Sequence, residues 1–173
     1  TNPCGEQPLL SYESCNLGSI NLAACVTSGG FDYGTLGEVV RRSVRFLDSV
    51  IDVNLYPVPE IRAATLRTRK IGLGVMGLAD AFIRMGIPYQ SDEALSWTES
   101  VMRFIQDEAH AASEELGEER GSFPAIDQSI YTGPMRNATV TTVAPTGSLH
   151  LIAGTSSGIE PLFSLSYSRT ING

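Results

Sequence analysis

The chain has 173 residues, of which 42% are hydrophobic and 8% aromatic, a composition typical of a folded domain with a buried core. Its formal net charge of −7 disfavours a nucleic-acid surface, because binding to a phosphate backbone needs clustered Lys and Arg. No apolar run approaches the roughly 18 residues of a membrane span and no secretory leader is recognisable, so a cytoplasmic location is expected.

The first fifteen residues place an amide, a thiol and a carboxylate at alternating positions, Asn2, Cys4 and Glu6. If this stretch is extended, the three side chains point the same way. Pro3 disfavours a helical Asn2, and Gly5 lets the backbone pass close to a ligand. The three groups then face one small molecule. An equally weighted alternative is a Pro/Gly turn with a buried thiol.

The next segments predict a short strand and two helices. Residues 16–26 alternate apolar and small polar residues and predict a strand or loop-strand piece, in which Cys25 is a small buried hydrophobe. Thr35 is expected to cap a helix from Leu36 to about Val53, because its apolar residues recur at spacings of three and four. A short helix is expected from Glu60 to about Leu66.

Residues 72–77, GLGVMG, match the dinucleotide-binding pattern GxGxxG, and a helix from Leu78 to Met85 follows. That fingerprint also requires a hydrophobic strand before the first glycine and an acidic residue at the end of a second strand about twenty residues later. Here a basic run precedes the motif, and Asp92 begins a helix. We therefore interpret the glycines as part of an element packed tightly against a neighbour.

The last third of the chain predicts a long helix, a strand and a turn. Ser91 starts a helix from Asp92 to about Leu116, and residues 137–144 are rich in β-branched residues, which indicates a buried strand. The small-residue turn 145–148 leads into a helix start, where backbone N–H groups can bind an anion without Lys or Arg. An ordinary strand-to-helix turn is the favoured alternative on local sequence. A final strand is expected from Leu162 to Ser168. The alternation indicates an α/β fold with too few strands for a full barrel.

Four groups of motifs together resemble the catalytic region of ribonucleotide reductases, most closely the adenosylcobalamin-dependent class II form. They are NPCGEQPLL at 2–10, ESCNLGSINL at 13–22, IGLGVMGLAD at 71–80, and PTGS at 145–148 with SGIEP at 157–161. The resemblance implies a ten-stranded α/β barrel of two half-barrels. Residues 1–173 would be a single fragment of that incomplete barrel, with a finger loop at 1–15 and a phosphate-binding turn at 145–149.

The resemblance also implies a role for each candidate site residue. Cys4 would become the thiyl radical that abstracts the ribose 3′ hydrogen, Glu6 would accept the 3′ hydroxyl proton, and Asn2 would hydrogen-bond the ribose hydroxyls. Cys15 would be one of two redox-active thiols that reduce the 2′ position and become a disulfide. The substrate phosphates would be held by backbone N–H groups of four residues: Thr146, Gly147, Ser148 and Leu149.

The function implied is reduction of ribonucleoside di- or triphosphates to 2′-deoxyribonucleotides, an oxidoreductase step of deoxyribonucleotide biosynthesis. Adenosylcobalamin would be the cofactor of the full enzyme, with no binding by this fragment alone and no metal site. The expected partners are the rest of the barrel, a thioredoxin-type reductant acting through C-terminal thiols absent here, and a second copy in a homodimer. Because the partner of Cys15 lies outside the chain, the fragment alone is expected to be inactive.

Three alternatives remain open. A class I enzyme would take its radical from a separate metal-containing subunit, although the continuation QPLL after Glu6 tilts the comparison towards class II. A non-catalytic nucleotide-binding module would keep the fold without the reaction, yet Asn2, Cys4 and Glu6 are all present. A cysteine hydrolase would need a histidine base, and neither His110 nor His150 lies in a supporting pattern.

Overall fold

The structure is a computed structural model that describes residues 1–162, 164 and 166. The predicted final strand, Leu162 to Ser168, falls largely outside the described residues. In chain order the elements are β1 (Asn16–Asn21), the 3₁₀ helix η1 (Leu22–Cys25), β2 (Val26–Thr27), β3 (Gly30–Phe31), α1 (Tyr33–Val53), α2 (Pro59–Thr68), β4 (Ile71–Met76), α3 (Leu78–Met85), α4 (Asp92–Arg120), the 3₁₀ helix η2 (Ile126–Gln128) and α5 (Leu149–Ala153).

Strands β1 and β4 form a parallel pair, in register from Asn16 opposite Ile71 to Asn21 opposite Met76. All six residues of β4 are buried, so Gly72 and Gly74 lie inside the strand, and Gly77 follows it as the N-cap of α3. A Cβ on Gly72 would lie 2.6 Å from Leu17 Cδ2, and one on Gly74 would lie 2.8 Å from the carbonyl oxygen of Thr142. The prediction of a tightly packed glycine-lined element is therefore confirmed.

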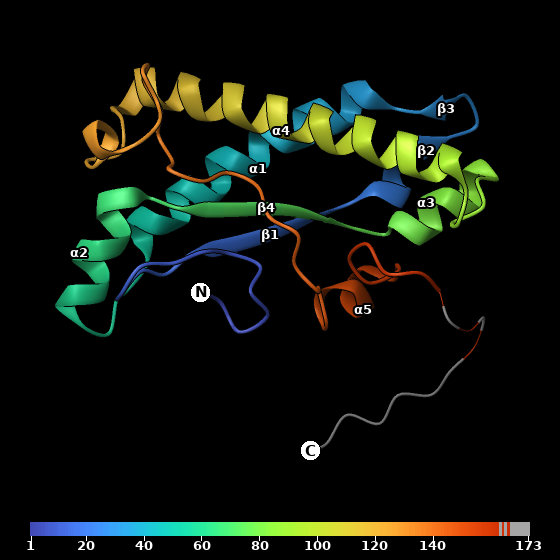
Figure 1. The fold of residues 1–173 in the computed structure, drawn as a ribbon, viewed down its shortest axis with the longest axis horizontal. Helices are drawn as coiled ribbons and strands as arrows, with labels where there is room; N and C mark the ends of the chain where they lie inside the picture. The colour runs from blue at the N-terminus through green and yellow to red at the C-terminus, as the bar shows by residue number, and fades with distance from the viewer. Residues whose placement is uncertain (163, 165, 167–173) are drawn as a thin grey trace.

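Helices α1 and α4 lie on one side of the strand pair, and the N-terminal segment and α5 lie on the other (Figure 1). Helix α1 packs on both strands and on α4. The apolar stripe predicted for α1 is buried: Leu36, Val40, Val44, Leu47 and Ile51. It meets a second buried stripe on α4: Val101, Ile105, Ala109, Ala112 and Leu116. These two stripes and the strands form the main core.

Two helix ends differ from the prediction. Helix α1 begins at Tyr33, and its N-cap is Asp32, because Asp32 Oδ1 accepts the backbone N–H of Thr35 at 2.9 Å. Thr35 is thus inside the first turn and is not the cap. Helix α4 continues past Leu116 to Arg120. Gly117 lies inside it and packs closely on the segment that follows, where a Cβ would lie 2.7 Å from Met135 N.

Residues 137–144 lie along β4 but do not form the regular strand predicted for them. One isolated parallel bridge joins Leu73 to Thr141. The adjacent carbonyls of Thr139 and Val140 accept from Ile71 N at 3.1 Å and Leu73 N at 2.8 Å, whereas a regular ladder would use alternate residues. This one-residue shift acts like a β-bulge and ends the regular pairing.

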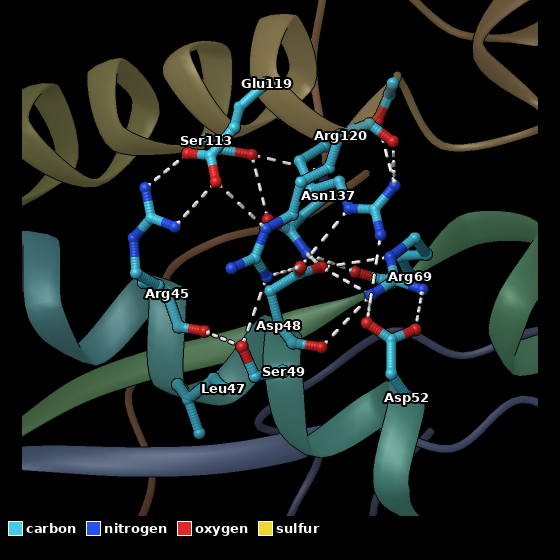
Figure 2. A network of polar contacts seen from close by, with 12 residues as sticks. Arg45, Leu47, Asp48, Ser49, Asp52, Arg69, Ser113, Glu119, Arg120 and Asn137 are labelled. Carbon is cyan, nitrogen blue, oxygen red and sulfur yellow. Dashed lines mark hydrogen bonds and ion pairs between the residues drawn. The ribbon is translucent and has the colours of Figure 1, made fainter.

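The buried carboxylate of Asp48, on α1, links this helix to the end of α4, to Arg69 and to residues 136–137. Its Oδ1 accepts from Arg69 Nε at 2.9 Å and Asn137 Nδ2 at 3.0 Å, and its Oδ2 accepts from Arg136 Nε at 3.2 Å and Arg120 Nη1 at 3.4 Å. Asp48 is 0% exposed, and Figure 2 shows the cluster between α1 and the end of α4. Removing this carboxylate would leave Arg69, Arg120 and Arg136 without their shared acceptor, with Asp52 as the remaining partner of Arg69 at 2.7 Å.

The fold is α/β, as predicted, and the strands within the described residues form two separate two-stranded sheets with no closed sheet. Among the same residues, no helix combines the length and the apolar character needed to traverse a membrane.

Candidate active site

Residues 2–5 form a tight turn, so the extended conformation is wrong and the equally weighted Pro/Gly turn is confirmed, although the thiol of Cys4 is exposed and not buried. The backbone N–H of Gly5 donates to the carbonyl of Asn2 at 3.0 Å, and Gly5 has a φ of +74°. Asn and Pro at the first two positions and Gly at the fourth are the residues that a β-turn favours. The alternation of side chains therefore does not apply, and a turn brings the functional groups together instead.

The turn places the carboxylate of Glu6 beside the backbone of Cys4. The N–H of Cys4 donates to Glu6 Oε2 at 3.1 Å. Cys4 is a free, exposed cysteine. An accessible thiol and a carboxylate two residues away can both reach a molecule that approaches this turn.

Two side-chain hydrogen bonds fasten Glu6 and Gln7 to the segment that lies along β4. Thr142 Oγ1 donates to the carbonyl of Glu6, and Gln7 Nε2 donates to Thr139 Oγ1. Gln7 is 1% exposed, so its amide is an internal anchor. The N-terminal turn is consequently held by residues more than 130 positions later in the chain.

The turn at 145–149 has an unusual backbone at Thr146, which has a φ of +54°. A β-branched residue in the left-handed region costs on the order of 1–3 kcal/mol, and such strain is concentrated at functional sites. Its carbonyl accepts from the backbone N–H of His150 at 3.1 Å and from His150 Nδ1 at 2.7 Å. Since a carbonyl can only accept, Nδ1 carries the hydrogen of this buried imidazole.

Glu6 and the 145–149 turn line one pocket of about 220 Å³. The remaining wall comes from Ala144 and from β1, through Leu17, Gly18 and Ser19. Cys4 is not among the lining residues. The pocket is smaller than the roughly 300–1,000 Å³ of typical small-molecule sites. The residues of this chain therefore form only part of the wall of a binding site.

Cys15 lies immediately before β1 and is half-buried. Its Sγ donates to the carbonyl of Asn16 at 3.4 Å. Burial raises the pKa of the Cys15 thiol to about 12; the charge of Lys70 opposes this rise, while Glu13 and Glu6 add to it. At neutral pH the group is therefore a protonated thiol.

Glu13 and Lys70 were not identified as site residues from the sequence. Glu13 accepts from Leu10 N at 2.6 Å, Thr68 Oγ1 at 2.6 Å and Lys70 Nζ at 2.8 Å. Burial raises the pKa of Glu13, but these three hydrogen bonds together outweigh it and hold the pKa below its usual value. The pair fixes the loop between Cys4 and Cys15. The position of Glu13 in the motif ESCN was the available sequence clue.

Cys25 is buried, as predicted, and lies beyond the far end of β1 from Cys15. A six-residue strand spans about 20 Å at roughly 3.3 Å per residue. A disulfide requires Cα atoms within about 7 Å. Cys25 therefore cannot pair with Cys15 in this fold.

Glu6 thus lines the same pocket as three residues of the predicted phosphate-binding turn, Thr146, Gly147 and Leu149. Asn2 and Cys4 lie on the adjacent N-terminal turn, and Cys15 lies at the start of the strand that forms the pocket wall. Ser148 precedes α5 but does not line the pocket.

The chain is part of an α/β domain that carries an exposed thiol. Its two main strands are parallel and are joined through helices, and Cys4 and Glu6 lie close together at the N-terminal turn. The chain belongs to the ribonucleotide reductase barrel domain family, whose family model matches residues 1–134 and 125–173.

Curated proteins similar to the chain are named as ribonucleoside-diphosphate reductases. The chain is 58% identical, over its whole length, to a vitamin B12-dependent ribonucleoside-diphosphate reductase of Mycobacterium tuberculosis, of which it covers 25%. It is 57% identical, over 99% of its length, to a protein of the same name from Thermoplasma acidophilum, of which it covers 23%. It is 34% identical, over 91% of its length, to a ribonucleoside-diphosphate reductase large subunit of Variola virus, covering 24% of that protein. The chain spans about a quarter of the length of these relatives.

Proposed function

We propose that the protein to which this chain belongs reduces ribonucleoside diphosphates to 2′-deoxyribonucleotides as a class II ribonucleotide reductase. Residues 1–173 would be one piece of its ten-stranded α/β barrel, with the finger loop at 1–15 and the phosphate-binding turn at 145–149. The observation that carries the proposal is the shared pocket of Glu6 and the Thr146 turn, which joins the two ends of the chain at one site.

The class II assignment rests on the relatives. Identity is 57–58% to proteins named as vitamin B12-dependent ribonucleoside-diphosphate reductases, against 34% to the Variola virus large subunit. The names of these relatives also favour a diphosphate substrate over a triphosphate. The continuation QPLL after Glu6 had already favoured class II on sequence grounds.

In this proposal Cys4, as a thiyl radical, removes the hydrogen atom from C3′ of the ribose. Glu6 then accepts the proton of the 3′ hydroxyl, a transfer that needs a carboxylate within about 2.6–3.2 Å of that group. Asn2 hydrogen-bonds the ribose hydroxyls. The placement of Glu6 in the pocket, with Cys4 two residues away on the same turn, supports this division of roles.

Cys15 supplies one of the two thiols consumed. The 2′ hydroxyl leaves as water, and two thiols give up two electrons and two protons to form a disulfide, so the reaction balances. Burial keeps Cys15 protonated and able to deliver its hydrogen. Because Cys25 is out of reach, the second thiol must come from the rest of the protein, and a thioredoxin-type reductant would restore both.

Adenosylcobalamin would supply the initial radical in the full protein. The pocket beside Glu6, of about 220 Å³, does not fit a cofactor of this size, since it is below the range for ordinary small ligands. The binding surface of the cofactor is therefore assigned to the remainder of the protein. A homodimer and a cytoplasmic location are also proposed; the three free cysteines suit a reducing compartment.

The test uses the full-length protein with a nucleoside diphosphate, adenosylcobalamin and a dithiol reductant, without a second subunit. Deoxyribonucleotide formation is expected. Cys4→Ser should abolish it while substrate binding persists, and Cys25→Ser, which alters a thiol outside the site, should retain it. Activity that appears only when a metal-containing subunit is added would contradict the class II assignment. Activity in Cys4→Ser would contradict the radical role.

A further inference from the structure

The turn at 155–158 is bonded on one side to the first turn of α3. Asp80 Oδ2 accepts from the backbone N–H of Ser156 and from Thr155 Oγ1, each at 2.8 Å. The N–H of Asp80 donates to Ser156 Oγ at 3.3 Å. The N–H of Gly77 donates to the carbonyl of Ser156 at 2.8 Å. Ser156 is thus held through its backbone and its side chain.

The last glycine of the GxGxxG motif makes this contact possible. Gly77 has a φ of +76°, and a Cβ there would lie 2.5 Å from Thr155 Oγ1 and 2.4 Å from Asn21 Oδ1. A side chain would therefore push the 155–158 turn away from α3. The close approach at Gly77 lets Asp80 reach this turn.

On its other side the same turn holds the segment around Thr146. The N–H of Gly158 donates to Thr146 Oγ1 at 2.8 Å, and Ser157 Oγ donates to the carbonyl of Pro145 at 2.5 Å. Gly158 approaches so closely that a Cβ would lie 3.0 Å from the carbonyl oxygen of Ala144. Thr146, in its left-handed conformation, is therefore fixed from outside the pocket that it lines with Glu6.

We propose that Asp80 is a positioning residue for the substrate diphosphate. It holds Ser156, the 155–158 turn holds Thr146, and Thr146 sets the shape of the turn that faces the phosphates. This inference rests on the proposed function of the 145–149 turn and names a residue that acts on that site from α3. Asp80 is not among the residues that line the pocket beside Glu6.

The test measures KM and kcat for a nucleoside diphosphate in the full-length protein. Asp80→Ala should raise KM about tenfold, with kcat within roughly twofold, because a displaced turn weakens phosphate binding more than it affects the ribose chemistry. Asp80→Asn should recover most of the loss, since its amide oxygen can still accept from Ser156 and Thr155. Arg84→Ala is the matched control: Arg84 is on the same helix but donates to the carbonyl of Ala23, so KM should be unchanged.

A second measurement separates positioning from folding. The inhibition constant of a nucleoside without phosphates should be the same in wild type and Asp80→Ala, whereas that of inorganic pyrophosphate should rise with KM. If Asp80→Ala does not fold, Thr155→Val removes one bond to Asp80 and should raise KM about threefold. An unchanged KM in these variants, or an equal loss for nucleoside and diphosphate, overturns the inference while the function stands. A wild-type protein that reduces no diphosphate overturns both.

Discussion

The hydroxyl of Thr142 donates a hydrogen bond to the backbone carbonyl of Glu6, and the two residues are 136 positions apart. Thr142 also joins β4, since its N–H donates to the carbonyl of Leu73 at 3.1 Å. Through Thr142, the turn that carries Cys4 and Glu6 is attached to the parallel strand pair. The scaffold therefore holds the backbone of Glu6, while its carboxylate accepts from the nearby N–H of Cys4.

This attachment predicts the behaviour of Thr142→Val. The substitution keeps the side-chain shape but removes the donor, and a neutral hydrogen bond contributes a net of about 0.5–1.5 kcal/mol. If this hydrogen bond positions Glu6 for proton transfer, kcat in the full-length protein should fall roughly two- to tenfold. Thr142→Ser keeps the donor and should restore kcat. Equal kcat for Thr142→Val and wild type would show that Glu6 is held by other contacts.

The buried carboxylate of Asp48 predicts a large loss of stability. Asp48→Ala leaves Arg69, Arg120 and Arg136 without their shared acceptor, and breaking a buried ion pair in this way costs about 3–5 kcal/mol. The measurement is the free energy of unfolding in urea. Glu99→Ala removes an exposed i,i+4 pair with Arg103 and should cost less than about 0.5 kcal/mol. Similar losses in the two variants would argue against a buried network.

Glu13 predicts a loss of stability in acid. Its pKa is lowered in the folded chain from the usual 4.5, so its contribution is present above pH 4.5 and is lost as the pH falls through the lower folded pKa. The difference in urea midpoint between wild type and Glu13→Gln should be constant above pH 4.5 and should shrink as the pH falls below 4.5. A difference that grows as the pH falls would mean that the pKa of Glu13 is raised.

The three thiols should react with iodoacetamide at different rates. Cys4 is exposed, Cys25 is buried, and the pKa of the half-buried Cys15 is raised to about 12. Because the thiolate is the nucleophile, Cys4 should be alkylated more than about tenfold faster than Cys15 at pH 8. Peptide mapping by mass spectrometry gives the three rates, and in urea they should converge. Equal rates for Cys4 and Cys15 without urea would contradict the burial of Cys15.

Several elements could be predicted because their patterns are local. The stripe from Leu36 to Ile51 identified α1, and the helix after the glycine motif was found at its observed bounds, Leu78 to Met85. The cap of α1 was misplaced by three residues, since both Asp32 and Thr35 have cap-forming side chains and the sequence does not rank them. The prediction of a regular strand at 137–144 was wrong. Its β-branched residues make side-chain hydrogen bonds to Gln7, Ile71 and Glu6 as well as backbone hydrogen bonds to β4.

The sequence by itself determined the family motifs, the identity of the candidate site residues and the interpretation of GxGxxG as a packing element. These follow from residue types and short spacings, which are properties of the chain alone. Only the tertiary structure decided that Glu6 shares a pocket with Thr146 and that Asp80 supports that turn from α3. Each of these depends on the register of β1 against β4 and on how residues 137–144 lie along β4. No local pattern encodes contacts between residues so far apart, because such contacts form only when burial brings distant segments together.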